Sequence, residues 1–387
     1  MHMVYLDNNA TTPIDPTVGE KMSRFLKTYF GNPSSLYPIG REVKEMIKEA
    51  RESVADALGA KRSEIVFTGS GTEADNFAVR GVMDAIPDKN EFITSAIEHP
   101  AIIETGHYLE SKGKKVIYVP VDPEGTIDLD FLRDAITSQT AMVSIMHANN
   151  EIGTIQPIEE VVRLAKERGV LVHTDAVQSF GKIDVLVNKL EVDLLSISAH
   201  KTYGPKGIGA LYVRKGTPIK PLIYGGHQER LMRAGTENTV GIVGFGKAVR
   251  VLLERGDKDK KTIAKLAERL KRGIEEKIPN VKFNGHEKNR IKGTLNFSFF
   301  GLEAEAILLS LGTKDIYVST GSACSEESED VSHVLRAIGL RPEVARSSVR
   351  MSLGRFNTEE DIDRVLTELP EIVEKLREIS GLDPNDF

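Results

Sequence analysis

Residues 171–178 read LVHTDAVQ, a short apolar run that ends in polar side chains. A run of this length, too short for a helix and followed by polar residues, predicts a buried strand that delivers Asp175 to the edge of a sheet. The same pattern recurs in both directions along the chain. The predicted strands are Ile65–Thr68, Phe92–Ser95, Val116–Val119, Met142–Met146, Leu171–His173, Leu194–Ile197 and Ala210–Val213.

Amphipathic stretches between several of these strands predict the helices Thr72–Ala85, Ala101–Ser111, Leu129–Ala135 and Ile158–Arg168. Strands and helices in alternation predict an α/β fold, with a mostly parallel seven-stranded sheet flanked by helices on both faces. Ligands of such sheets bind at the carboxyl ends of the strands.

The pattern changes after Gly256. A charge-rich segment, residues 257–277, predicts an exposed helix, and the later elements are a strand Thr294–Phe300, a helix from Glu303, a strand Ser348–Ser352 and a closing helix from Thr358. We therefore predict a large domain over residues 15–256, and a smaller α+β domain made of residues 1–14 with 257–387.

Composition narrows the class of protein. The chain has 387 residues, of which 40% are hydrophobic and 28% charged, and a net charge of -6. These values are typical of a globular protein and give no basic footprint for nucleic acid or an anionic membrane. The sequence shows neither a signal peptide nor an apolar run of about 20 residues. We expect a cytoplasmic protein without direct contact to nucleic acid or membrane.

A glycine-rich segment lies between the first predicted strand and the first predicted helix of the sheet. Residues 67–74 read FTGSGTEA. Free amides at the start of a helix, together with its dipole, form an anion site. The absence of Gly-Lys-Ser/Thr excludes a Walker A loop, whereas a dinucleotide site and a plain strand-to-helix turn both remain compatible with the segment.

Two further segments carry groups that complement a phosphate site. Asp175 at a strand end is either a helix N-cap or the partner of a protonated pyridine nitrogen. Residues 196–207 read SISAHKTYGPKG and place Lys201 just after a buried strand, where a lysine suits Schiff-base chemistry. A phosphate loop, an aspartate and a lysine in this order at strand ends indicate a site for pyridoxal 5'-phosphate.

Cys324 is the one cysteine of the sequence, which excludes an internal disulfide and a multi-cysteine metal site, and no metal site is predicted. A lone cysteine is more often a small buried hydrophobe than a nucleophile. Its surroundings argue otherwise, because residues 319–330 are rich in Ser, Gly and Glu and predict a mobile polar loop.

Over nearly its whole length the chain resembles the fold-type I pyridoxal-phosphate enzymes of the class-V aminotransferase family, and among them the cysteine desulfurases (NifS/IscS-like). The resemblance rests on motifs in the same order along the chain. They are Tyr5–Thr12, Gly31–Ser35, Glu98–Ala101, His147–Gly153, the lysine segment, Arg233–Asn238, Gly321–Cys324 and Val349–Phe356. The Ser-Ala-Cys context resembles the NifS/IscS type of cysteine loop, but the acidic run Ser325–Asp330 departs from the pattern.

The resemblance implies a role for each matching residue. Lys201 would carry the cofactor as a Schiff base, Asp175 would pair with its pyridine nitrogen, and Gln178 would hydrogen-bond its phenolic oxygen. His99 would stack on the ring, and Asn150 would contact the ring or the substrate. The phosphate would be held by Gly71, Thr72, Ser198 and His200.

Three further residues would complete the site. Thr236 would reach the phosphate from a partner subunit, because family members are homodimers with shared sites. Asn32 and Arg350 would bind the substrate carboxylate, with Arg346 and Arg355 as neighbouring alternatives to Arg350.

The implied reaction converts L-cysteine to L-alanine and leaves a persulfide on Cys324. Lys201 would remove the Cα proton, and His99 is the candidate proton handler for the thiol, whose acidic neighbours disfavour the thiolate. The persulfide would pass to an iron–sulfur assembly scaffold or another acceptor, with tRNA thiolation as a second destination. The alternatives are a related enzyme acting on another amino acid and a non-catalytic scaffold that keeps the fold.

Overall fold

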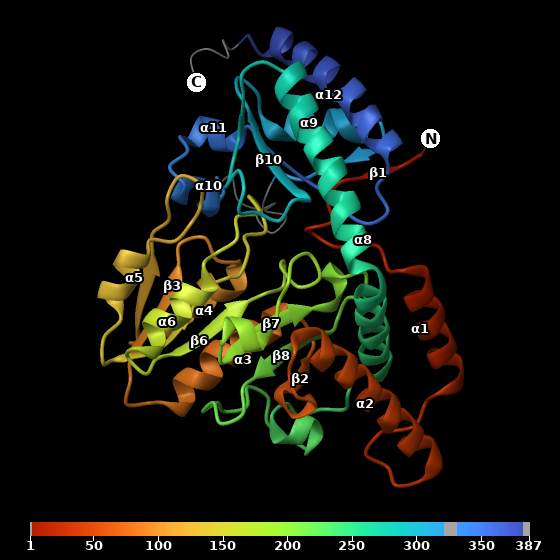
Figure 1. Cartoon of the computed structure of the whole chain (residues 1–387), viewed down its shortest axis with the longest axis vertical. Helices are drawn as coiled ribbons and strands as arrows, with labels where there is room; N and C mark the ends of the chain where they lie inside the picture. The colour runs from red at the N-terminus through yellow and green to blue at the C-terminus, as the bar shows by residue number, and fades with distance from the viewer. Residues whose placement is uncertain (1, 321–330, 382–387) are drawn as a thin grey trace.

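The computed structural model of the chain describes residues 2–320 and 331–381. The centre of the described chain is a seven-stranded sheet in the order β2-β8-β7-β6-β5-β3-β4, in which β8 runs opposite to the other six strands. The predicted fold and sheet are therefore confirmed (Figure 1). The strands are β2 Ile65–Thr68, β3 Glu91–Ser95, β4 Lys115–Val119, β5 Thr140–Ser144, β6 Leu171–Asp175, β7 Leu194–Ser198 and β8 Gly209–Val213.

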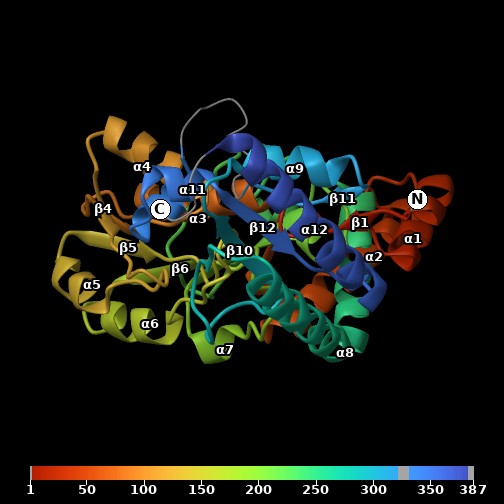
Figure 2. The ribbon, with the colours of Figure 1, turned by 90° about the horizontal axis from the view of Figure 1, so that it is seen from above.

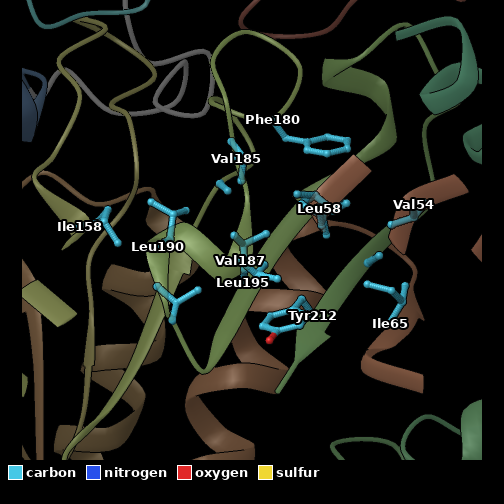
Figure 3. Packing of buried hydrophobic residues seen from close by; sticks show 14 of the residues in the cluster. Val54, Leu58, Ile65, Ile158, Phe180, Val185, Val187, Leu190, Leu195 and Tyr212 are labelled. Atoms are coloured by element: carbon cyan, nitrogen blue, oxygen red, sulfur yellow. The ribbon is translucent and has the colours of Figure 1, made fainter. Parts of the chain in front are cut away.

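Helices cover both faces of this sheet because successive strand residues point to opposite sides. Phe92 and Leu194 pack with α3 and α4, whereas Ile93 and Leu195 belong to the larger cluster with α2, α6 and α7 (Figure 3). The helices of this part are α1 Pro16–Thr28, α2 Pro38–Leu58, α3 Gly71–Ala85, α4 Pro100–Ser111, α5 Leu129–Ala135, α6 Ile158–Lys166 and α7 Val187–Leu190.

A second set of elements forms the upper part of the molecule in Figure 1, and its own apolar cluster joins residues 4–6 to residues 266–373. This separate cluster supports the proposed division into two domains. The elements are β1 Val4–Tyr5, β9 Val281–Phe283, β10 Thr294–Phe299, α9 Ala304–Gly312, β11 Ile316–Tyr317, α10 His333–Ala337, α11 Pro342–Arg346, β12 Ser348–Ser352 and α12 Glu359–Ser380.

Helix α8, Thr239–Lys277, connects the two parts (Figures 1 and 2). The helix predicted for residues 257–277 is its second half, so the predicted start was wrong by 18 residues. Glycines in the first half lower helix propensity but allow close packing, since a Cβ at Gly246 would lie 2.5 Å from the Cα of Ala50 in α2. Within the described ranges no helix combines the length and the apolar composition needed to cross a membrane.

Residues 7–12, here called the N-terminal strap, run between the two parts of the molecule. Asp7 pairs with Ser352 of β12, and the backbone N–H of Thr12 donates to the carbonyl of His200 at 2.9 Å. The strap therefore reaches from the small three-stranded sheet to the segment that carries Lys201.

Candidate active site

A cavity of about 900 Å³ opens where β6, β7 and the start of α3 meet the strap and β12. Most of the residues predicted for the cofactor and the substrate line this one cavity, although they come from segments far apart in the sequence. They are Gly71, Thr72, His99, Asn150, Asp175, Gln178, Ser198, His200, Lys201 and Arg350.

Lys201 ends the short 3-10 turn Ala199–Lys201 that follows β7. Its Nζ donates to the carbonyl oxygens of Asn9 and Ala10, at 2.5 and 2.7 Å. The strap thus holds the lysine amine at the floor of the cavity, where it is only partly exposed.

Asp175 lies at the carboxyl end of β6, and its Oδ1 accepts a hydrogen bond from the backbone N–H of Val177 at 2.8 Å. Burial raises the pKa of Asp175 to about 6. A cation beside this carboxyl would favour its charged form. The protonated ring nitrogen of pyridoxal phosphate is such a cation, so this position fits the predicted cofactor.

Further buried acids surround Asp175, and the sequence analysis missed them. Burial raises the pKa of Glu98 to about 8 and that of Asp75 well above its ordinary value. Between them His173 is fully buried, with Nδ1 2.8 Å from the Ser144 hydroxyl and Nε2 2.9 Å from that of Ser196. Burial lowers the pKa of His173 to about 3, so His173 and Glu98 are mainly neutral at neutral pH, and Asp175 is better placed than Glu98 to pair with a ring cation.

The start of α3 forms the predicted phosphate cradle. Ser70 caps this 15-residue helix by accepting the backbone N–H of Glu73 at 3.1 Å. A Cβ at Gly71 would lie 2.8 Å from Cγ2 of Val177, so the position admits only glycine beside the cavity. Amides of the first helical turn, together with Thr72, Ser198 and His200 in the wall, provide donors that suit a phosphate.

Two histidines of the cavity carry a proton on Nε2 but use opposite ring nitrogens for their contacts with the backbone. His99 caps α4 through Nδ1, which accepts the N–H of Ala101 at 3.1 Å, so the neutral ring carries its proton on Nε2. Burial, followed by the charges of Lys201 and His333, lowers the pKa of His99 to about 4. His333, missed in the sequence, lies 2.8 Å from the carbonyl oxygen of Glu98 through Nε2, which must donate. His99 therefore has its Nε2–H available to a group in the cavity, whereas the Nε2–H of His333 is used by the Glu98 carbonyl.

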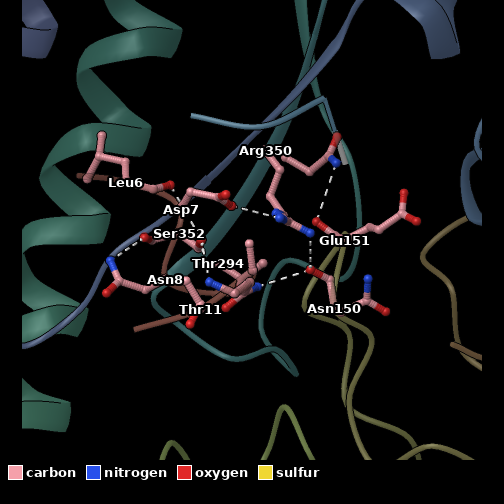
Figure 4. Close-up of polar contacts among 12 residues, drawn as sticks. Leu6, Asp7, Asn8, Thr11, Asn150, Glu151, Thr294, Arg350 and Ser352 are labelled. Carbon is pink, nitrogen blue, oxygen red and sulfur yellow. Dashed lines mark hydrogen bonds and ion pairs between the residues drawn. The ribbon is translucent and has the colours of Figure 1, made fainter. Parts of the chain in front are cut away.

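Arg350 lies at the junction of β12 and the strap (Figure 4). Its side chain is 2% exposed, and it donates to the carbonyl of Asn150 at 3.1 Å and to Oδ1 of Asp7 at 2.8 Å. Of the three arginines considered for the substrate carboxylate, Arg350 lines the large cavity. Arg355 instead pairs with Asp15 and Asp259, and Arg346 is exposed.

Asn9 of the strap is the most connected residue that sequence reasoning missed. Its N–H donates to the Ser352 hydroxyl at 2.9 Å, and its Nδ2 donates to the Asn150 carbonyl at 3.0 Å and the Thr294 hydroxyl at 2.9 Å. The only signal in the sequence was the polar motif of residues 7–12, which names no partner.

Among the described residues, Asn32 and Thr236 were predicted for the site but do not line this cavity. Asn32 is exposed in the turn after α1, where its Oδ1 accepts the N–H of Ser34 at 2.9 Å. Thr236 is also exposed. Cys324 and the rest of 321–330 lie outside the described residues. Across the remaining residues no group of three or more His, Cys, Asp or Glu side chains is arranged to hold a metal ion.

Comparison with known proteins identifies the family of the chain. The chain matches the aminotransferase class-V family over residues 4–365, and it belongs to that family, as the sequence predicted. The cysteine desulfurase IscS of Dictyoglomus turgidum (strain DSM 6724 / Z-1310) is 51% identical over 378 residues, which cover 97% of this chain and 96% of that relative.

Two solved structures extend the likeness to three dimensions. A NifS-like protein superposes with a TM-score of 0.91 at 42% identity, covering 97% of this chain and 100% of its own. A structure described as SspA in complex with cysteine has a TM-score of 0.82 at 38% identity, covering 92% of this chain and 100% of its own.

Proposed function

We propose that the chain is a pyridoxal-phosphate-dependent cysteine desulfurase. L-cysteine and the Cys324 thiol give L-alanine and a persulfide on Cys324, so that one C–S bond breaks and one S–S bond forms. The observation that carries the proposal is the convergence of Lys201, Asp175 and the start of α3 on one cavity. Relatives that are about half identical and named cysteine desulfurases support it over almost the whole chain.

The residues around the cavity would divide the work as follows. The bound cofactor supplies an electron sink for negative charge that develops at the substrate Cα. Lys201 Nζ takes the Cα proton and returns a proton later, since its amine lies at the cavity floor. Asp175 keeps the proton on the ring nitrogen, and Arg350 binds the substrate carboxylate through its guanidinium.

Other side chains hold the ring and handle the sulfur. Gln178 donates to the phenolic oxygen, while Asn150 and the stacked His99 position the ring. In its neutral tautomer His99 offers an Nε2–H donor to the Cys324 sulfur, which stabilises a thiolate by a charge-assisted bond. This contact would counter the acidic residues that follow Cys324 in the sequence.

The surface supports a homodimer. Phe30 and Leu36, in the connection between α1 and α2, are 85% and 80% exposed, and Tyr224 is 75% exposed. Large apolar side chains this exposed are typical of an interface with another chain. Within such a dimer, Thr236 would complete the phosphate site of the other subunit, and Asn32 would bind substrate there or after local rearrangement.

We further propose that the persulfide sulfur passes to a protein acceptor in the cytoplasm, of which an iron–sulfur assembly scaffold is the first candidate. To test this transfer, the purified enzyme that carries a labelled persulfide is incubated with a candidate scaffold protein. Transfer of label to the scaffold supports the proposal, and retention of all label on the enzyme rejects that scaffold as acceptor.

The test of the activity itself uses purified protein reconstituted with pyridoxal phosphate. Addition of L-cysteine should yield alanine, and sulfide in equal amount when a thiol reductant is present. Pyruvate or a new amino acid in place of alanine would indicate a lyase or an aminotransferase. A protein that stays colourless with added cofactor would indicate a scaffold.

A further inference from the structure

Lys182 lies on the opposite side of the strap from the catalytic cavity, in the turn after β6. It lines a second, mostly apolar cavity of about 240 Å³ between the two parts of the molecule. Its Nζ donates to Oδ1 of Asn9 at 2.7 Å and to Oε1 of Gln178 at 2.8 Å. A lysine amine that contacts two amide oxygens so close to a cofactor site has more than a surface role.

The contact to Gln178 determines which way its amide faces. A lysine nitrogen can only donate here, so the end of the amide next to Lys182 must be the oxygen. The other end, Nε2, then donates to the carbonyl of Asn9 at 2.9 Å and keeps a second hydrogen for the cavity that Gln178 lines. A flipped amide would place two donors against each other at Lys182.

The strap amide is oriented in the same way. Oδ1 of Asn9 accepts from Lys182, while its Nδ2 serves Asn150 and Thr294. The Asn9 carbonyl that Gln178 contacts also accepts from Lys201. Lys182 therefore orients Gln178, which lies at the predicted ring position, and also Asn9, the strap residue whose carbonyl accepts from Lys201.

Resting on the proposed function, we propose that Lys182 is a positioning residue that fixes Gln178 with its N–H end toward the phenolic oxygen of pyridoxal phosphate. The ammonium form of Lys182 has only donors, so it fixes both amide oxygens, whereas a neutral amine could also accept a hydrogen bond. Burial, followed by the charges of Lys201 and Arg350, lowers the pKa of Lys182 well below its ordinary value, so that deprotonation weakens this orientation.

The structure suggests a spectroscopic readout independent of turnover. A donor at the phenolic oxygen stabilises negative charge there, so the bound cofactor loses a proton more easily. The visible absorbance of the cofactor reports the loss of this proton. Lys182→Met removes one of the two contacts that hold the amide in this orientation, so the flipped form becomes more populated. The pH midpoint of the absorbance change should then rise by about one unit, the size expected for loss of a hydrogen bond to a charged group.

A double-mutant cycle with Gln178→Ala separates orientation from charge. If Lys182 acts through Gln178, Lys182→Met shifts the midpoint in the native background and has less than about a third of that effect in Gln178→Ala. Equal shifts in both backgrounds, or no shift in either, would overturn the proposal. Lys182→Arg keeps donors in the cavity and should restore most of the native midpoint.

The matched control is Lys260→Met, because Lys260 lines the same small cavity but pairs with Asp184 instead of the strap. Its midpoint should match the native one. If Lys182→Met fails to fold, Lys182→Ala with the same cycle gives the decision. A native protein that never acquires visible absorbance would reject the proposed function, whereas a coloured native protein with an additive cycle rejects only the role of Lys182.

Discussion

The strap separates two cavities that Asn9 and Lys201 both line, yet the two differ in chemistry. On one side, Asp175, His99 and Arg350 contribute ionisable groups to a large cavity. On the other side, Leu252, Ile263 and Leu353 contribute to a smaller and mostly apolar one. Reacting groups gather on the first side, whereas the second side supplies side chains that hold the strap and its lysine in place. Substitutions on the two sides should therefore change different measurable quantities.

The largest effect is expected for Lys201→Ala, which removes the proposed general base and attachment point. Alanine formation from cysteine should fall by about 10³-fold or more, and the cofactor colour should be lost on dialysis. Steady-state kinetics and absorbance check both. Lys260→Met, on the apolar side, should keep activity within a few-fold of the native protein, and an equal loss in the two variants would remove the distinction between the cavities.

Two buried arginines sharpen the contrast. Arg350→Met should raise KM for cysteine by roughly 100-fold with a smaller change in kcat, because a charged bond to the substrate carboxylate is lost. Arg355→Met leaves Asp15 and Asp259 without their shared cation and should lower the free energy of unfolding by about 3 kcal/mol.

Thermal or urea unfolding and steady-state kinetics of both arginine variants separate the two expectations. Each variant serves as the control of the other. A large KM change in Arg355→Met, with Arg350→Met kinetically native, would reverse the assignment of the carboxylate site.

Gly71→Ala tests the phosphate cradle. The added Cβ would come within 2.8 Å of Val177, so the start of α3 must shift and the affinity for pyridoxal phosphate should fall by about tenfold. Fluorescence titration measures this affinity. Gly19→Ala in α1 is the control, because nothing lies within 4 Å of its added Cβ and the helix should gain up to about 1 kcal/mol. Unchanged cofactor affinity in Gly71→Ala would place the phosphate elsewhere.

A smaller effect is expected in the pH dependence of stability. The pKa of buried Glu98 is about 8 in the folded chain, against 4.5 for an ordinary glutamate. Between these two pH values the folded state binds more protons than the unfolded state. The free energy of unfolding therefore falls by about 1.4 kcal/mol for each unit of rising pH. Glu98→Gln resembles the neutral acid and should remove this slope between roughly pH 5 and 8. Urea unfolding at several pH values checks it, and parallel native and variant curves would contradict a neutral Glu98.

The sheet could be predicted because apolar runs of four or five residues recur at regular intervals, and β2, β7 and β12 lie within one residue of the predicted ranges. The first half of α8 could not be predicted from the sequence. Its glycines read as breaks, whereas close packing against Ala50 makes them favourable.

The candidate site was predictable wherever a residue type stands at a strand end, as with Asp175 and Lys201. Partners that meet only in three dimensions were not predictable. Asn9 and Glu98 lie in motifs that assigned them no role, and Lys182 lies in no motif, because their roles depend on contacts with segments distant in the sequence.

The most direct experiment concerns Cys324, the proposed acceptor of the sulfur. The native protein and Cys324→Ala, both loaded with cofactor, are mixed with ³⁴S-labelled cysteine without reductant and analysed by mass spectrometry. We expect one added labelled sulfur on Cys324 and a matching amount of alanine in the native protein. Cys324→Ala should keep the cofactor colour and form neither. Undiminished release of sulfur and alanine by Cys324→Ala would contradict the account.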